Sequence, residues 1–141
     1  MGRTIAIDFG RKRLGIAVTD PFGNFAQGLT TVPTGTAIEF LRKYDAEIGI
    51  DCFVVGMPKT LLNEDSESVR FLKPFMAGFK KAFPEHKIVY IDERFTSKLA
   101  FGAMIDAGLK KKDRQNKELV DTISATIILQ SYLEQKENNL L

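Results

Sequence analysis

The sequence contains a single cysteine, Cys52, and no apolar run long enough to cross a membrane. One cysteine cannot form an internal disulfide bond, which excludes a disulfide-stabilised scaffold and favours a reducing, cytoplasmic environment. A membrane helix needs about 18–20 consecutive apolar residues, so no membrane partner is expected. The short apolar stretch after Met1 ends at Asp8, which predicts that no signal peptide is present.

A strong charge of either sign is also lacking, because 20 Lys and Arg residues oppose 18 Asp and Glu residues and leave a net charge of +2. This balance does not indicate a nucleic-acid partner by itself, so any such argument depends on where the charges cluster. The hydrophobic fraction of 44% and the charged fraction of 27% exclude a disordered tail, a collagen-like rod and a coiled coil. A length of 141 residues predicts one domain over 1–141, with a flexible polar tail at 134–141.

The first third of the chain has the pattern of strands joined by tight turns. Apolar runs predict three antiparallel strands, at 4–8, 14–18 and 25–32. After these strands, apolar residues recur at helical spacing up to Ile48, which predicts a helix. Thr36, with Glu39 three residues later, predicts a capping box at the start of this helix.

The rest of the chain alternates strands and helices. Strands are predicted at 52–55 and 88–91, and helices at 69–83, 97–107 and 118–133. Both strands are apolar runs typical of strands buried on both faces, while Pro74 predicts a kink or an early break in its helix. The order predicts an α/β fold with a mixed five-stranded sheet, three antiparallel strands then two parallel ones, and helices on both faces. Ribonuclease H has this topology.

Acidic residues follow two of these strands and lie near the start of the last helix. Asp8 ends the first strand, and Asp92 and Glu93 end the last one, where open α/β sheets bind ligands. Asp121 lies on an apolar and small-residue stripe, where a carboxylate costs several kcal/mol unless a cation or hydrogen bonds compensate it. Three converging carboxylates would repel one another, so the pattern predicts a Mg²⁺ or Mn²⁺ site with oxygen ligands.

Each acid also has a structural interpretation. Asp8 can have a purely structural role, in which it accepts hydrogen bonds from backbone N–H groups of the turn. Asp121 can be an ordinary acid near a helix N-terminus. Strand alternation places Asp92 and Glu93 on opposite faces, so both cannot easily hold one ion. Spacing alone leaves these alternatives open.

Four segments carry a resemblance to a known family. They are 8–17 (DFGRKRLGIA), 56–58 (GMP), 92–97 (DERFTS) and 121–125 (DTISA). In this order they resemble the motifs of the YqgF/RuvX family of Holliday-junction resolvases and pre-16S rRNA nucleases. The resemblance implies a ribonuclease H-like fold and metal-dependent phosphodiester hydrolysis, with Asp8, Glu93 and Asp121 as catalytic acids and metal ligands. It favours 5′-end processing of pre-16S rRNA, with Holliday-junction resolution as the alternative.

The expected mechanism follows from charge, because the anionic oxygens of a phosphodiester repel hydroxide. Two Mg²⁺ or Mn²⁺ ions about 3.5–4 Å apart would generate the attacking hydroxide and stabilise the leaving oxygen. Asp8 is expected to bridge both ions, with Glu93 and Asp121 holding one each. No histidine base is required, and His86 is expected at the surface. Cys52 is expected to be inert in its buried strand.

Basic residues near these acids are expected to bind the phosphate backbone of a nucleic acid. They are Arg11, Lys12 and Arg13 beside Asp8, Arg94 beside Glu93, and Lys110, Lys111, Lys112, Arg114 and Lys117 before the last helix. Phosphate contacts carry no sequence information, so recognition by shape is expected. The alternative for the last group is a solvated run of charge. Gly15 is interpreted as a turn or packing glycine, or as a point of close approach to the substrate.

Two other classes of function fit parts of the pattern. The hairpin that begins at Asp8 is similar to the first phosphate loop of the actin and sugar-kinase superfamily, but those proteins hold nucleotide between two lobes, and 141 residues supply one. A non-catalytic nucleic-acid-binding ribosome-maturation factor would keep the acids for structural reasons. The sequence leaves open precursor rRNA or branched DNA as the partner, and a monomer or a homodimer as the assembly.

Overall fold

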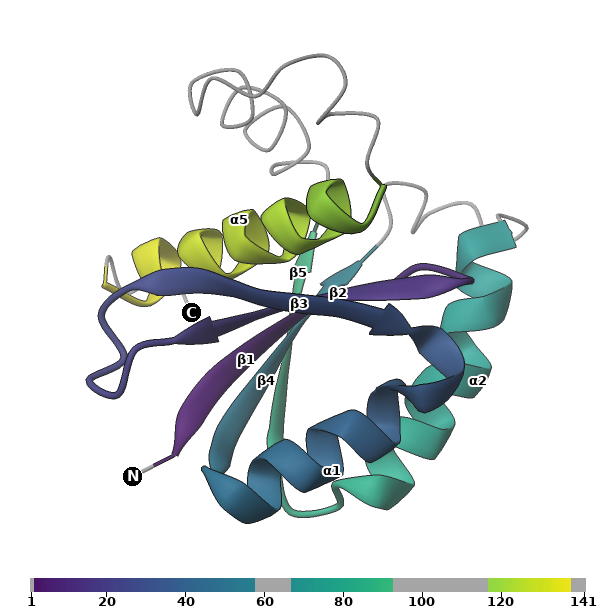
Figure 1. Cartoon of the computed structure of the whole chain (residues 1–141), viewed down its shortest axis with the longest axis horizontal. Coiled ribbons are helices and arrows are strands. Elements are labelled where there is room, and N and C mark those ends of the chain that lie inside the picture. The colour runs from purple at the N-terminus through teal and green to yellow at the C-terminus, as the bar shows by residue number, and fades with distance from the viewer. Residues whose placement is uncertain (1, 58–66, 93–116, 138–141) are drawn as a thin grey trace.

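The computed structural model describes residues 2–57, 67–92 and 117–137, which form a sheet flanked by helices (Figure 1). The strands are β1 (Arg3–Asp8), β2 (Arg13–Thr19), β3 (Ala26–Pro33), β4 (Ile50–Met57) and β5 (Lys87–Asp92). The helices are a short 3-10 turn, η1 (Thr34–Thr36), and α1 (Ala37–Glu47), α2 (Glu67–Ala82) and α5 (Lys117–Glu137). The helix predicted at 97–107 lies outside the described residues. Within them, no helix is both long and apolar enough to span a membrane.

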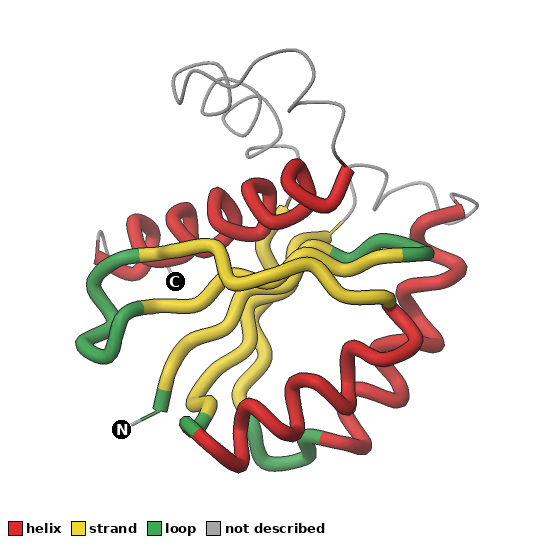
Figure 2. Tube along the Cα trace, viewed as in Figure 1, coloured by secondary structure: helices red, strands yellow, loops and turns green. Residues whose placement is uncertain are grey.

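The five strands form one sheet in the order β3-β2-β1-β4-β5. β2 pairs antiparallel with β1 and with β3, whereas β4 pairs parallel with β1 and with β5. Chain direction explains this difference, since tight turns reverse the first three strands and helical crossovers return the last two. α5 covers one face of the sheet, and α1 and α2 cover the other (Figure 2). The predicted α/β architecture is confirmed.

Strand alternation divides the core into two layers. Ile5 and Ile7 of β1 belong to the layer shared with α1 and α2, where Phe53 of β4 packs edge-on against Phe79 with 4.7 Å between ring centroids. Ala6, between them, belongs to the layer under α5. Because side chains two apart on a strand share a face, this division fixes which strand-end residues lie under α5.

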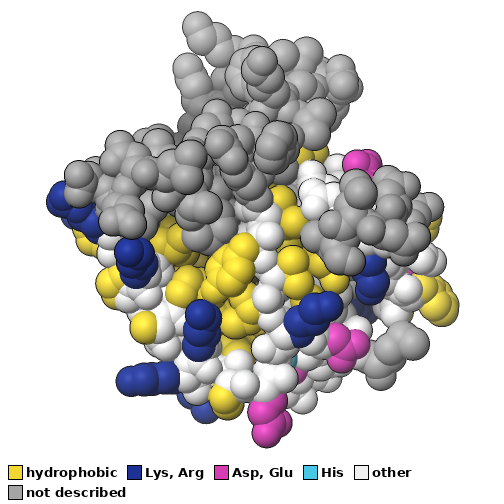
Figure 3. Space-filling view, turned by 180° about the vertical axis from the view of Figure 1, so that it is seen from behind, with side chains coloured by type: hydrophobic (Ala, Val, Ile, Leu, Met, Phe, Trp, Pro, Cys, Tyr) yellow, Lys and Arg dark blue, Asp and Glu magenta, His cyan; other side chains and the backbone are white. Residues whose placement is uncertain are grey.

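β4 and β5 differ in burial although both are apolar runs. β4 is buried from Cys52 to Gly56, as predicted. β5 is an edge of the sheet formed by the described residues, and Tyr90 is 41% exposed, so the prediction of a fully buried strand is wrong here. From behind, hydrophobic side chains reach the surface between basic ones (Figure 3). An apolar run has the same period at the centre and at the edge of a sheet, so periodicity does not separate the two cases.

Cys52 lies in the layer beneath α5, in the same cluster as Tyr132. Burial raises the pKa of the Cys52 thiol and also the pKa of the Tyr132 phenol. We therefore expect the thiol of the folded protein to react with Ellman's reagent at pH 8 at least about tenfold more slowly than in urea, since the thiolate is the reactive form. Equal labelling rates in the two states, followed by absorbance, would contradict the buried position.

Three details predicted for the helices are wrong. The Thr36 side chain makes no capping bond to α1, because its hydroxyl donates to the Pro33 carbonyl at 3.1 Å within η1. The early break predicted as one outcome at Pro74 does not occur, because α2 continues through this residue and its buried face contributes more than the one hydrogen bond that proline removes. α5 extends to Glu137, so residues 134–137 of the predicted tail are helical, as their helix-forming side chains favour.

The prediction of a surface position for His86 is also wrong. Its side chain is 21% exposed, and Nε2 lies 2.9 Å from the Oδ2 of Asp45 near the end of α1. The imidazole ring packs on Phe53 and Phe83, with centroid distances of 5.5 and 5.2 Å. Asp45 also accepts the N–H bond of Ile50, so the cluster joins α1 to the beginning of β4. His86 is therefore a structural residue at the end of the sheet opposite Asp8.

Candidate active site

Asp8 is the last residue of β1, at the carboxyl end of the strand. Ala6, two residues earlier, packs in the layer under α5, so alternation places Asp8 on the same face. Asp8 is partly buried and interacts with at least one other residue. The first predicted acid therefore lies where the sheet edge meets α5.

Glycines flank Asp8 on both neighbouring strands. In register, Asp8 pairs with Gly15 of β2 and with Gly56 of β4. A Cβ atom built on Gly15 would overlap the backbone carbonyl of Asp121 in α5. The absence of a side chain at Gly15 thus lets α5 rest directly on β2, one strand away from Asp8. The backbone of Asp121 therefore lies next to the strand position that pairs with Asp8, on the same face of the sheet.

The carboxylate of Asp121 is bound by an arginine from the sheet. Arg13 Nε lies 3.1 Å from Asp121 Oδ2, and the two side chains are 32% and 27% exposed. The bond links the first residue of β2 to the first turns of α5. A pair of threonines forms a second link between the sheet and α5, because the hydroxyl oxygens of Thr31 in β3 and Thr122 in α5 are hydrogen-bonded at 2.6 Å. The N-terminal part of α5 is therefore held in place by polar as well as backbone contacts.

The loop between β1 and β2 is attached to α2 by aromatic contacts. The Phe9 and Phe75 rings lie 5.1 Å apart between centroids. The Arg11 guanidinium lies 4.5 Å from the centroid of the Phe71 ring, a cation–π contact. This contact holds the Arg11 guanidinium next to α2, at the sheet end that carries Asp8.

Thr34 holds the same loop from the other side. Its hydroxyl donates to the Gly10 carbonyl at 2.6 Å, and its N–H donates to the Lys12 carbonyl at 3.0 Å. These bonds satisfy the loop backbone and leave the Lys12 side chain exposed. The basic segment beside Asp8 is therefore ordered from both sides.

The third predicted acid follows β5. Gly56, the partner of Asp8, pairs with Ile91, which packs under α5. Asp92 ends the strand, and Glu93 lies outside the described residues. The predicted phosphate-binding residues Arg94, Lys110, Lys111, Lys112 and Arg114 also lie outside them, and Lys117 is the first residue of α5.

The donors present suit a hard divalent ion. In the ranges 2–57, 67–92 and 117–137, no three His, Cys, Asp or Glu residues are close enough to hold a metal by themselves. The site supplies two carboxylates there, Asp8 and Asp121, and carboxylate oxygens are preferred ligands of Mg²⁺ and Mn²⁺. Because the register partners of Asp8 are Gly15 and Gly56, neither neighbouring strand has a side chain at the position next to it. Remaining ligands would come from water, phosphate or a further acid.

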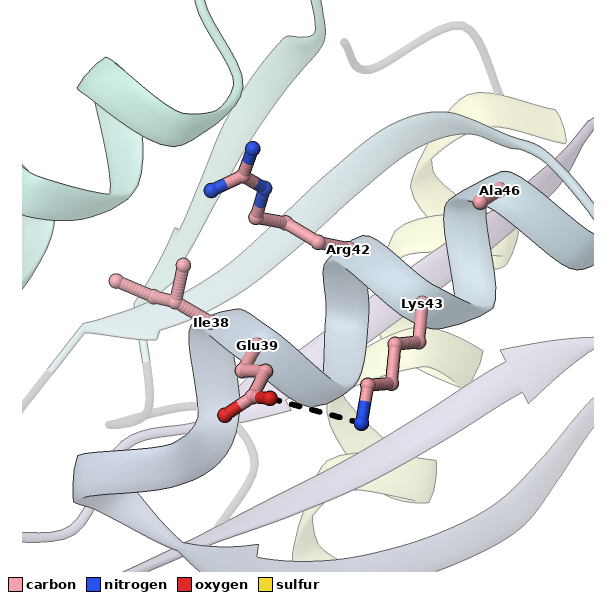
Figure 4. Close-up of a pocket in the computed structure, with 5 residues that line it drawn as sticks. All are labelled: Ile38, Glu39, Arg42, Lys43 and Ala46. Atoms are coloured by element: carbon pink, nitrogen blue, oxygen red, sulfur yellow. Dashed lines mark ion pairs between the residues drawn. The ribbon is translucent and has the colours of Figure 1, made fainter.

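A shallow pocket lies elsewhere, on the outer side of α1. It has a volume of about 350 Å³, and its lining residues all come from that helix: Ile38, Glu39, Arg42, Lys43 and Ala46 (Figure 4). Lys43 Nζ and Glu39 Oε1 form an exposed pair 3.5 Å apart. Because α1 and Asp8 lie on opposite faces of the sheet, this pocket is separate from the acids.

Two features of the site were not predicted from the sequence, the Arg13–Asp121 bond and the cation–π contact of Arg11 with Phe71. A signal for the first was present. Ala17 packs under α5 and Gly15 touches it, so alternation along β2 assigns Arg13 to the same face. No comparable periodic signal connects Phe71 with the loop, because the contact depends on the crossing of α2 over the sheet edge.

The strand order and the helices on both faces of the sheet define a ribonuclease H-like fold. The fold is similar to that of Thermus thermophilus RuvC in complex with a Holliday junction substrate, with a TM-score of 0.60, 13% identity, and coverage of 96% of this chain and 97% of that chain. A second Thermus thermophilus RuvC structure has a TM-score of 0.56 at 14% identity, covering 95% and 96%. At such low identity the likeness concerns the fold alone.

The chain belongs to the RuvX family, whose model is described as Holliday junction resolvase and matches residues 2–135. A relative from Bacteroides thetaiotaomicron is 55% identical over 136 residues, which is 96% of this chain and 99% of the relative. A relative from Flavobacterium johnsoniae is 50% identical over 136 residues, again 96% and 99%. Both are named "Putative pre-16S rRNA nuclease". The resemblance noted from four motifs is confirmed.

Proposed function

We propose that this protein is a metal-dependent endonuclease that hydrolyses phosphodiester bonds in structured nucleic acid. The observation that carries the proposal is the contact of the Asp121 backbone in α5 with Gly15, which is the register partner of Asp8 on β2. Two partly buried carboxylates from remote parts of the chain are costly to bring together unless a cation compensates them. Membership of a family of nucleases supports the same chemistry.

The acids have distinct expected roles. Asp8 and Asp121 would hold divalent ions, and Glu93 is proposed as the third ligand because positions 91 and 93 of a continued strand share a face. Ile91 already packs on the α5 side. When bound, Mg²⁺ or Mn²⁺ supplies a hydroxide nucleophile at neutral pH and neutralises charge on the leaving oxygen.

The basic residues would bind the phosphate backbone next to these acids. Arg11 is held by Phe71, and Lys12 is exposed on the ordered loop, so both are presented at the edge that carries Asp8. We extend this role to Arg94, and to Lys110, Lys111, Lys112, Arg114 and Lys117. Contacts of this kind recognise the shape of the nucleic acid rather than its sequence.

As the substrate we propose precursor 16S rRNA, cleaved near its 5′ end. The relatives that are 50–55% identical over nearly their whole length carry the name of a pre-16S rRNA nuclease. The second candidate is a four-way DNA junction, which is favoured by the description of the family and by the fold of RuvC. A junction resolvase would need a two-fold dimer to cut symmetric strands.

A side-by-side cleavage assay tests the proposal. Purified protein is incubated with precursor 16S rRNA and with a four-way DNA junction, each with Mg²⁺, Mn²⁺ or EDTA, and with Asp121→Asn protein as the control. We expect cleavage of the rRNA precursor that EDTA stops and that Asp121→Asn reduces by at least about 100-fold, more than loss of an outer-shell partner costs. Symmetric cuts in the junction alone would favour the resolvase. Failure to cut either substrate would favour a non-catalytic maturation factor.

A further inference from the structure

The bond between Arg13 and Asp121 joins a fixed cation to a carboxylate of the candidate metal site. Nε of Arg13 donates to Oδ2 of Asp121 at 3.1 Å. A guanidinium and a divalent ion compete for the lone pairs of one oxygen, because the first donates protons to them and the second coordinates them. The bond therefore affects the binding of a divalent ion at Asp121.

We propose that Arg13 is a resident counter-cation of the metal site. It neutralises Asp121 when no ion is present, and it gives up Oδ2 when a divalent ion binds. This inference rests on the proposed function, since it takes Asp121 to be a metal ligand. Arg13 is a positioning residue in this scheme and makes no contact with the reacting atoms while it is bound to Asp121.

The geometry allows such an exchange. The Arg13 and Asp121 side chains are 32% and 27% exposed, so solvent reaches both partners of the ion pair. Its backbone, by contrast, is fixed, because Arg13 begins β2 and pairs with Pro33 of β3. A guanidinium within a few ångströms of a divalent ion is also repelled by it, which favours rotation of the side chain once the ion is in place.

The released guanidinium would lie beside the bound ions, where a phosphate of the substrate carries negative charge. Arginine suits this second partner, since its planar fork matches phosphate oxygens. Arg13 would thus bind the nucleic acid only after the ion has taken Asp121. Metal binding and nucleic-acid binding would then strengthen each other, because coupling between two ligands is reciprocal.

Calorimetric titration with Mn²⁺ tests the inference without any measurement of activity. We expect Arg13→Gln to tighten Mn²⁺ binding by about two- to fivefold, the fold-change that corresponds to removing a partly exposed ion pair. Arg13→Lys keeps the charge and should stay near the wild-type affinity. Lys12→Gln is the matched control, since it removes the same charge at the neighbouring position and leaves the bond between Arg13 and Asp121 in place.

The outcomes separate the inference from the proposed function. If Asp121→Asn weakens Mn²⁺ binding while Arg13→Gln binds no more tightly than Lys12→Gln, the counter-cation role is wrong and the metal site stands. If wild-type protein and Asp121→Asn both fail to bind Mn²⁺, both proposals are wrong. A thermal melt adds a second readout: in EDTA, Arg13→Gln should lower the Tm by about 1–3 °C, and Mn²⁺ should raise it by more than in wild type.

Discussion

We expect Asp8→Asn to remove metal-dependent cleavage and to leave the fold intact. Asparagine has the same shape as aspartate but no charge, so β1 should keep its register with Gly15 and Gly56 while the site loses one of its proposed anionic ligands. Since loss of an outer-shell partner alone costs 10–100-fold, we expect loss of this ligand to reduce the cleavage rate by at least about 100-fold. The rate is measured with precursor rRNA and Mg²⁺, and the fold is checked by circular dichroism.

Asp51→Asn is the matched control for this change. Asp51 lies on the sheet as Asp8 does, but on β4 near its amino end, where its Oδ2 accepts the N–H bond of Gly2 at 3.0 Å. Removing its charge should leave cleavage unchanged. Full activity of Asp8→Asn, in the test tube and in 16S rRNA maturation in cells, would instead assign the acids a structural role.

The architecture was predictable because local patterns and topology agree. Apolar runs bounded by turns gave five strands, and the lengths of the connections decided which pairs are parallel. Asp8 and Asp121 were predictable as neighbours for a different reason. Asp8 ends a strand that a helix covers, and Asp121 lies on the packed stripe of a helix. Both were therefore expected between the sheet and a helix that covers it.

Other features depend on packing that no local pattern contains. Tyr90 is exposed because β5 is an edge strand of the described sheet, and the order of strands is a property of the whole fold. His86 is half-buried because the rings of Phe53 and Phe83 meet beside it. Pro74 stays within α2 because tertiary contacts outweigh the lost hydrogen bond. In each case a long-range contact overrode the local preference.

The Arg13–Asp121 bond shows how such a contact changes the interpretation of a site. The basic loop beside Asp8 predicted three phosphate-binding residues of equal standing. In the structure they differ: Arg11 stacks on Phe71, Lys12 is exposed, and Arg13 binds a candidate catalytic acid. Charge and proximity in sequence predict a phosphate-binding surface, but the partner of Arg13 follows from the alternation of β2 and the position of α5.

Gly15→Ala is expected to damage both the stability and the activity of the protein. The added Cβ would overlap the carbonyl group of Asp121, which belongs to the backbone of α5 and cannot rotate away as a side chain could. α5 must therefore move off β2, and overpacking of this kind costs about 1–3 kcal/mol. The displacement also moves Asp121 relative to Asp8, and a misplacement of about 1 Å can reduce a rate by about 100-fold.

Gly78→Ala separates this steric effect from the general effect of replacing glycine. Gly78 lies within α2, and the nearest atom to a Cβ placed there is Cδ1 of Ile38 at 3.8 Å, an ordinary contact. Alanine in a helix is favoured over glycine, so this variant should gain about 0.5–1 kcal/mol in the free energy of unfolding. Urea unfolding of both variants, with cleavage rates at saturating Mg²⁺, gives the comparison.

The two glycine variants should therefore change stability in opposite directions, and only Gly15→Ala should lose activity. Wild-type stability and cleavage in Gly15→Ala would mean that α5 does not depend on this contact for its position. The convergence of Asp8 and Asp121 would then lack its structural cause. Loss of stability with full activity would show instead that the acids keep their geometry when α5 shifts, which would contradict the role of Gly15 in aligning the site.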